Sequence, residues 1–208
     1  NQVAHLTMRC NNKKSFFNLE RDFSGIVSWL NTLPLFFQVS IHHALIMPNH
    51  IHLLVSAQSH NVGLAMSYFL TNLSKFLNFQ QNRINHIFGN RYRPTVILNE
   101  KHLVNVIRYI YQNPVRAGIV KNVENYPYSS LGFYMGTKNN GMILSPDSFT
   151  NNFFDLGFQG LELWTKHLNS TLNESDVEHV RKSLARSFYK FSRTQLMTLH
   201  QDNTTLSI

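Results

Sequence analysis

The 208-residue chain is poor in cysteine, in acidic residues and in long apolar runs. Its single cysteine, Cys10, excludes a framework of internal disulfides and is typical of a reducing compartment. We therefore expect a cytoplasmic protein with Cys10 in its core. The longest apolar stretch, "LPLFFQVSIHHALIM", is interrupted by Gln38, His42 and His43, so no segment reaches the roughly 18–20 apolar residues of a membrane span. We expect no membrane partner.

The shortage of acidic residues leaves the chain strongly basic. Aspartate and glutamate number 11 against 19 lysines and arginines, which gives a net charge of +8 and a pI near 9.7. Such a surplus favours a polyanionic partner, with nucleic acid as the first candidate. The alternative is a protein that is merely basic. The 43% of hydrophobic residues is enough for one domain with a real core and a small appendage.

The order of periodic segments predicts the fold class. Strands are expected at residues 3–10, 37–47, 50–57 and 90–98, and helices at 20–33, 63–82 and 99–113. The first helix is expected to end at Pro34. This β-α-β-β-α-β-α order is the ferredoxin-like pattern with one extra helix, an α+β fold whose antiparallel sheet is flanked by helices.

A shift in composition divides the chain. Residues 1–137 are predicted to form the main domain. A loop-like stretch rich in Gly, Asn and Pro follows, and residues 138–208 are interpreted as a mainly helical C-terminal appendage of unknown role, with a helix at 174–188.

The stretch "IMPNHIHLLV" places His50 and His52 on either side of Ile51. In a strand, residues two apart leave the same face, so both imidazoles would point one way while Ile51 enters the core. That arrangement suits a metal site, and a pair of hydrogen-bonded structural histidines is the alternative. His42 and His43, in the preceding strand, would alternate faces, and we interpret both as structural.

The predicted helix at 99–113 carries a tyrosine and a carboxamide one turn apart. Tyr109 and Asn113 are four residues apart and share one flank, on which His102 also falls, whereas Tyr111 lies on the opposite flank. The alternative is an amphipathic helix whose aromatic edge only packs, with Asn113 as a helix-end residue.

Basic residues close to an aromatic ring suggest contacts with nucleic acid. Arg91 and Arg93 flank Tyr92, and guanidinium groups bind phosphates while a tyrosine can stack on an unpaired base. Ordinary solvated surface charge is the alternative. Further candidate contacts come from a basic turn and from the segment after the last helix of the main domain: Lys13, Lys14 and Arg116.

The stretch "MPNHIHLLV", followed by "RYIYQNPVRAGIV", resembles the HUH single-tyrosine transposases and more closely their REP-associated branch, the RAYT proteins. In that family a strand carries His-hydrophobic-His, a helix carries the nucleophilic tyrosine, and a polar residue four positions later completes the metal site. The pattern maps onto His50, His52, Tyr109 and Asn113. The resemblance covers about residues 3–132.

The resemblance implies metal-dependent nicking and strand transfer of single-stranded DNA. Tyr109 would form a covalent 5′-phosphotyrosine, and His50, His52 and Asn113 would hold Mg²⁺ or Mn²⁺, although two imidazoles alone could equally take Zn²⁺ or Ni²⁺. The implied partner is single-stranded or hairpin DNA from a repeat or a transposon end, and a monomer is favoured over a dimer. The alternatives are a non-catalytic or domesticated hairpin-binding regulator of the same fold, and a metal-dependent RNA-binding or phosphodiesterase protein.

Overall fold

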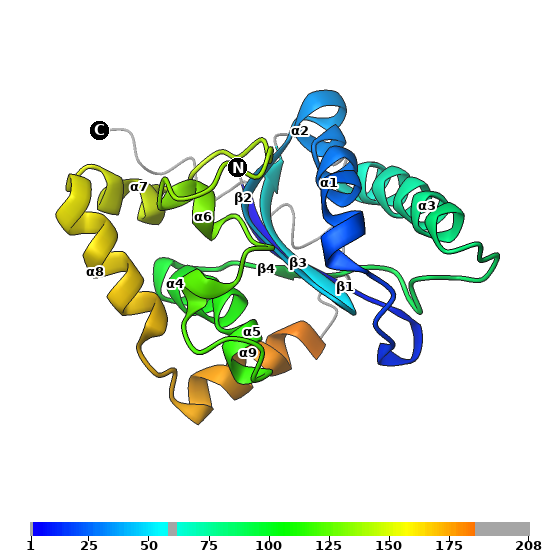
Figure 1. Ribbon diagram of the computed structural model, residues 1–208. Helices are drawn as coiled ribbons and strands as arrows, with labels where there is room; N and C mark the ends of the chain where they lie inside the picture. Colours follow the sequence, from blue (N-terminus) through cyan, green and yellow to red (C-terminus); the bar gives the residue numbers. More distant parts are fainter. Residues whose placement is uncertain (1, 58–61, 186–208) are drawn as a thin grey trace, which may run out of the picture.

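The computed structural model describes residues 2–57 and 62–185, which build one antiparallel sheet with helices on both faces (Figure 1). The sheet has the strand order β2-β3-β1-β4. The strands are β1 (Gln2–Arg9), β2 (Val39–Met47), β3 (His50–Ala57) and β4 (Arg93–Val96). Since β1 and β2 are joined by helices while β2 and β3 form a hairpin, this is the ferredoxin-like arrangement, and the predicted α+β fold is confirmed.

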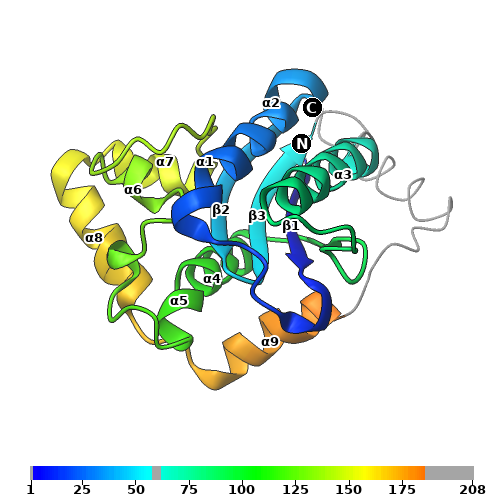
Figure 2. The same cartoon turned by 45° about the vertical axis from the view of Figure 1, so that its right-hand side comes forward.

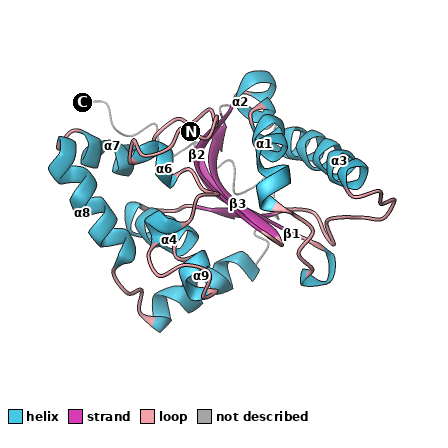
Figure 3. Ribbon diagram, in the orientation of Figure 1, coloured by secondary structure: helices cyan, strands magenta, loops and turns pink. Residues whose placement is uncertain are grey.

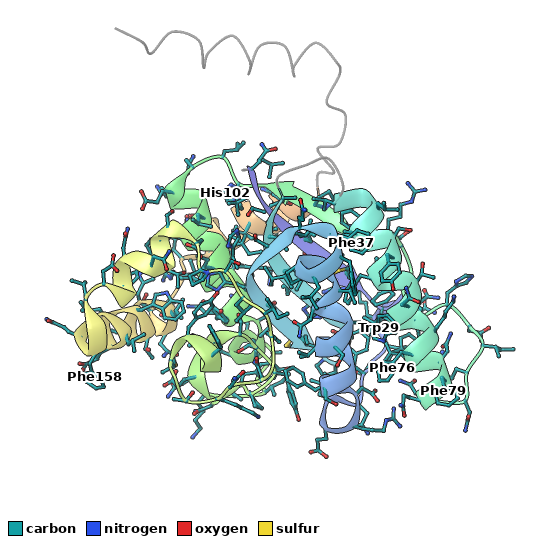
Figure 4. All side chains as sticks on the ribbon, turned by 90° about the horizontal axis from the view of Figure 1, so that it is seen from above. Trp29, Phe37, Phe76, Phe79, His102 and Phe158 are labelled. Carbon is teal, nitrogen blue, oxygen red and sulfur yellow. The ribbon has the colours of Figure 1, made fainter. Side chains whose placement is uncertain are left out.

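The helices divide between the two faces of the sheet (Figure 3). One face is covered by α1 (Leu19–Leu30), α2 (Thr32–Phe37) and α3 (Val62–Gln80), and the other by α4 (Glu100–Tyr111). Figure 4 shows Trp29 and Phe76 on the α1–α3 side and His102 on the other side.

Two predicted boundaries at the first crossover are wrong. Pro34 does not end a helix, because α2 begins at Thr32 and holds Pro34 in its first turn, where the missing N–H is not needed. The following strand begins two residues later than predicted, because Gln38 takes a left-handed φ of 55° that ends α2.

Alternation along β1 and β3 gives the sheet two chemically different faces. Leu6 and Ile51 are fully buried on the apolar face, which α1 and α3 cover. On the opposite face Thr7 pairs with His52 and Arg9 with His50, so polar residues line up beneath α4. The sheet thus buries its apolar core on one side and carries the candidate site on the other.

The C-terminal part is mainly helical, as predicted, and packs around α4. After α5 (Asn113–Arg116) come α6 (Leu131–Tyr134), α7 (Ser148–Phe154), α8 (Gly157–Asn169) and α9 (Glu174–Ala185). Two short 3-10 turns, η1 (Asn11–Lys13) and η2 (Val123–Asn125), complete the described elements. The predicted helix at 174–188 corresponds to α9, and its last three positions lie outside the described residues. Within residues 2–57 and 62–185, no helix is long and apolar enough to cross a membrane.

A β-bulge in β2 turns both neighbouring histidines toward the C-terminal part. The register shifts between Ile41 and His43, so strict alternation fails and His42 and His43 do not separate to opposite faces. His42 contacts the Ser145 carbonyl oxygen through Nδ1 at 2.6 Å, and His43 Nε2 lies 2.7 Å from Asp147 Oδ2. Both histidines therefore join the sheet to the segment that precedes α7.

The buried His43–Asp147 pair gives the first prediction. Burial alone would raise the pKa of Asp147, but hydrogen bonds and charge from His43, with hydrogen bonds from Thr150, hold that pKa well below its usual range. Replacing Asp147→Asn should lower the free energy of unfolding at pH 7 by about 3 kcal/mol, because one partner of a buried pair is removed.

The sign of the pH dependence follows from the lowered pKa. A carboxyl whose pKa is depressed by folding stabilises the protein above about pH 4 and loses that contribution as the pH falls. Urea unfolding should therefore show the difference between wild type and Asp147→Asn shrinking below pH 4. The exposed Asp155→Asn serves as control, and equal stabilities of Asp147→Asn and wild type at pH 7 would contradict the assignment.

Candidate active site

An N-terminal cap stabilises the start of α4, and an apolar stripe determines which side of the helix packs on the sheet. The Asn99 side chain accepts a hydrogen bond from the His102 amide, and Glu100 lies in the first turn, where an acidic side chain favours the helix dipole. The buried residues at helical spacing lie against the sheet and include Leu103, Val106, Ile107 and Ile110. This packing fixes which way the two tyrosines of the helix point.

Tyr109 and Tyr111 lie over different strands. The Tyr109 ring lies 6.5 Å from the His5 ring on β1 and 6.0 Å from the His52 ring on β3, measured between centroids. The Tyr111 hydroxyl lies 2.7 Å from His43 Nδ1 on β2, is fully buried, and burial raises its pKa well above the ordinary value. Of the two hydroxyls, that of Tyr111 is committed to a core network.

The two histidines of β3 share a face, with their ring centroids 4.9 Å apart and their planes at 85°. The Nδ1 atom of His50 lies 2.5 Å from Asn49 Oδ1, and that of His52 lies 2.9 Å from His5 Nε2. His52 Nε2 is buried and has no hydrogen-bond partner among the described residues. With Nδ1 engaged on each ring, Nε2 is the nitrogen that a ligand would meet, and an orphaned buried nitrogen is what a metal ligand presents before its metal arrives.

Burial keeps these imidazoles neutral. It lowers the pKa of His5 to about 3 with help from the charge of His102, and that of His50 to about 4 with help from Arg9. Burial and the neighbouring positive charges hold the pKa of His52 well below its ordinary value. Neutral imidazole has a free lone pair, so at pH 7 both histidines of β3 are in the form that binds a metal.

Asn113 opens α5 directly after the tyrosine helix. Its Nδ2 donates to the carbonyl oxygens of Tyr109 at 2.8 Å and Ile110 at 3.3 Å. The amide is therefore held against the turn that carries Tyr109, with Oδ1 as its remaining polar atom. In the part of the chain that the structure describes, no three histidine, cysteine, aspartate or glutamate side chains gather as a metal site, so a metal on the histidine pair would need oxygen ligands of another kind.

Tyr109 borders a cleft of about 590 Å³ that is lined by cations. Three predicted residues are brought together there, namely Lys13, Arg91 and Arg93, and no acidic side chain lines the cleft among the residues that the structure describes. Residues that we did not predict also line it: Thr7, Arg9, Cys10, Asn11, Asn12, Gly89, Asn90 and Arg181. The sequence carried a signal for Arg9, because it alternates with Thr7 on the polar face of β1, but none for Arg181.

The other predicted contacts lie around this cleft. The Arg116 guanidinium carbon lies 4.4 Å from the centroid of the Tyr109 ring, and its Nη2 donates to the Tyr109 carbonyl oxygen at 2.7 Å. Tyr92 lines a second cavity of about 690 Å³ together with Arg91 and residues of α3. Lys14 is exposed and is not among the residues that line the cleft.

Comparison with known proteins shows to which class of protein this chain belongs. Residues 1–113 match the family of IS200-like transposases, which are DNA-processing enzymes, and this match covers more than half of the chain. The chain belongs to the IS200-like transposase family.

Two relatives are more specific. A Haemophilus influenzae protein assigned as a REP-associated tyrosine transposase is 34% identical over 96 residues, an alignment that covers 41% of this chain and about half (54%) of the relative. A REP-associated tyrosine transposase solved bound to a REP hairpin has a TM-score of 0.56 and 18% identity, and covers 71% of this chain and 88% of that chain. The resemblance drawn from the sequence motifs is confirmed, and the structural likeness supports the fold.

Proposed function

We propose that this protein nicks single-stranded DNA and transfers the strand through a covalent 5′-phosphotyrosine on Tyr109, acting on hairpin-forming repeat or transposon-end DNA. One observation carries the proposal: the Tyr109 ring lies 6.0 Å from the ring of His52, which has His50 beside it, and Tyr109 also borders a cleft whose described lining holds five cations and no acidic side chain. Cations without carboxylates suit a phosphodiester backbone.

In the proposed reaction, the Tyr109 oxygen attacks a backbone phosphorus. The Tyr109 hydroxyl loses its proton as its oxygen bonds to phosphorus, the bond from phosphorus to the 3′ oxygen breaks, and the leaving 3′ oxygen takes up a proton to become a hydroxyl, so protons balance. The phosphotyrosine conserves the bond, so a second 3′-hydroxyl can reverse the step and join a new strand without a nucleotide cofactor. Arg116 supports this role, since it stacks on the Tyr109 ring and holds the adjoining main chain.

The donor types of the two histidines and of Asn113 suit a divalent metal. His50 and His52 would bind Mg²⁺ or Mn²⁺ through Nε2, and Asn113 would add its Oδ1, while open positions accept phosphate oxygens. When bound, the ion would polarise the scissile phosphate and neutralise developing charge. The chain itself would hold each imidazole in one tautomer, through Asn49 for His50 and through His5 for His52.

A covalent-complex gel tests the proposal against its alternatives. The probe is a pool of 3′-labelled hairpin oligonucleotides with randomised single-stranded flanks, incubated with the full chain and Mn²⁺. We expect a labelled species that survives SDS and that does not form when EDTA is present from the start of the incubation. A hairpin-binding regulator would shift the probe only in a native gel, and a phosphodiesterase would cut it without an adduct; either result would overturn the proposal.

The basic cleft predicts a steep dependence of DNA binding on salt. Each neutralised phosphate on a single strand contributes a log–log slope of about −0.7, so Arg91→Ala/Arg93→Ala should flatten the slope by about 1 to 1.5. Anisotropy of a labelled hairpin over a salt series measures it. A matched control removes two exposed lysines outside the cleft, Lys121→Ala/Lys138→Ala, and should change the slope far less. If the arginine double variant keeps the wild-type slope, the DNA path lies elsewhere.

A further inference from the structure

We infer that α9 is a wall of the DNA-binding cleft and that Arg181 binds a backbone phosphate beside Tyr109. This inference rests on the proposed function and extends it to a part of the chain that follows the matched residues 1–113. It assigns to the C-terminal part a direct contact with the nucleic-acid strand.

The helix α9 lies against the elements that carry the candidate site. Viewed as in Figure 2, α9 runs beneath α5 toward the end of the sheet where β1 finishes. It contacts both α4 and β4, the elements that bear Tyr109 and Arg93. Arg181, in the second half of the helix, lines the same cleft as those two residues.

A clamp on α4 fixes the turn that leads into α9. Arg108 Nη2 donates to the Ser170 carbonyl oxygen at 2.7 Å, to Ser170 Oγ at 2.9 Å and to the Thr171 carbonyl oxygen at 3.0 Å. Gln112 Nε2 donates to the carbonyl oxygens of Leu168 at 2.8 Å and Ser170 at 2.7 Å. Arg108 lies on the helix of the candidate nucleophile and Gln112 is the C-cap of that helix. This Arg108/Gln112 clamp therefore fixes the position of the turn before α9 relative to Tyr109.

The positive charges of Arg116 and Arg181 both lie near Tyr109. Arg181 lines the cleft together with Tyr109, over whose ring the Arg116 guanidinium lies, and burial and the positive charge of Arg181 both lower the pKa of Arg116. The ion pairs present among the described residues are Arg21–Asp22, His43–Asp147 and Lys182–Glu178, none of which involves a cation of the cleft. Like charges held together without a carboxylate favour an anion between them, and a phosphodiester is the anion that the proposed reaction provides.

Neighbouring cations of α9 give a matched pair for the test. Lys182 lies 3.7 Å from Glu178 one turn away and does not line the cleft, whereas Arg181 does. Binding of a labelled hairpin oligonucleotide with single-stranded flanks would be measured over a salt series in the Tyr109→Phe protein, which separates binding from chemistry. Arg181→Ala should flatten the log–log slope by about 0.7, the share of one phosphate contact on a single strand. Lys182→Ala should leave the slope unchanged.

Two different outcomes would contradict the role of α9 and the proposed function separately. If Arg181→Ala behaves like Lys182→Ala while Arg91→Ala/Arg93→Ala flattens the slope, the cleft binds DNA without α9 and this inference is wrong. If the parent protein shows no salt-dependent binding of the hairpin probe, the proposed function itself fails.

A second variant tests the Arg108/Gln112 clamp. Arg108→Met keeps the apolar stem and removes the three hydrogen bonds to Ser170 and Thr171. It should reproduce the loss of slope seen for Arg181→Ala, and adding Arg181→Ala to it should cause little further change. Additive losses would show that the clamp does not position Arg181.

Discussion

Replacing Tyr109 by phenylalanine should abolish the covalent protein–DNA adduct while leaving the fold and hairpin binding in place. The hydroxyl is the attacking atom in the proposed step, and the ring, which packs near His5 and His52 and under Arg116, is retained. The expected loss of adduct is complete, because a phenylalanine ring has no oxygen with which to attack the phosphorus.

The matched control is Tyr111→Phe, two residues away on the same helix. Its hydroxyl lies 2.7 Å from His43 Nδ1 and 2.8 Å from Ser130 Oγ. Removing it should lower the free energy of unfolding by about 1–3 kcal/mol, since buried polar partners lose a hydrogen bond, and should leave adduct formation intact. Trypsin would release both tyrosines in one peptide, and fragment ions would assign the phosphate. Phosphate on Tyr111 would overturn the choice of nucleophile.

Replacing His50 or His52 by alanine should remove metal-dependent cleavage and weaken Mn²⁺ binding by at least about 100-fold. Outer partners of metal-bound histidines already contribute 10–100-fold to affinity, and loss of a ligand costs at least as much. Calorimetric titration of the full chain with Mn²⁺ measures affinity independently of activity. The exposed His86→Ala is the control, and nicking by His50→Ala equal to wild type in Mn²⁺ would exclude it as a ligand.

Substitutions at His5 should weaken Mn²⁺ binding less than the loss of a metal ligand does. Its Nε2 lies 2.9 Å from His52 Nδ1, so His5→Leu should lose about 10–100-fold in Mn²⁺ affinity by releasing the ring of His52. His5→Gln can still accept a hydrogen bond through its amide oxygen and should recover most of that affinity. Equal losses in both variants would indicate a packing role for His5 in place of positioning.

Local sequence patterns predicted the parts of the site that depend on local geometry. The "PN" turn fixes the start of β3, and two-residue alternation then places His50 and His52 on one face. Helical periodicity separates Tyr109 from Tyr111 in the same way. These features need only the backbone of one element, which is why a single sequence was enough.

The features that were missed depend on how distant segments meet. His5 reaches His52 because of the β1–β3 register, which pairs Thr7 with His52, and no local pattern encodes that register. The bulge at His42 breaks the alternation on which its predicted face relied. Arg181 enters the cleft only because α9 folds back against α4 and β4.

The helix α4 faces two ways, and this matters for anyone who exchanges parts between relatives. Tyr109 borders the cleft, whereas Arg108 and Gln112 bond to the turn before α9, and Tyr111 contacts His43, which in turn contacts Asp147. A chimera that joined a foreign C-terminal region after α5 would keep these side chains and lose their partners. A chimera would therefore have to exchange Arg108, Tyr111 and Gln112, and His43 on β2, together with the C-terminal region that they contact.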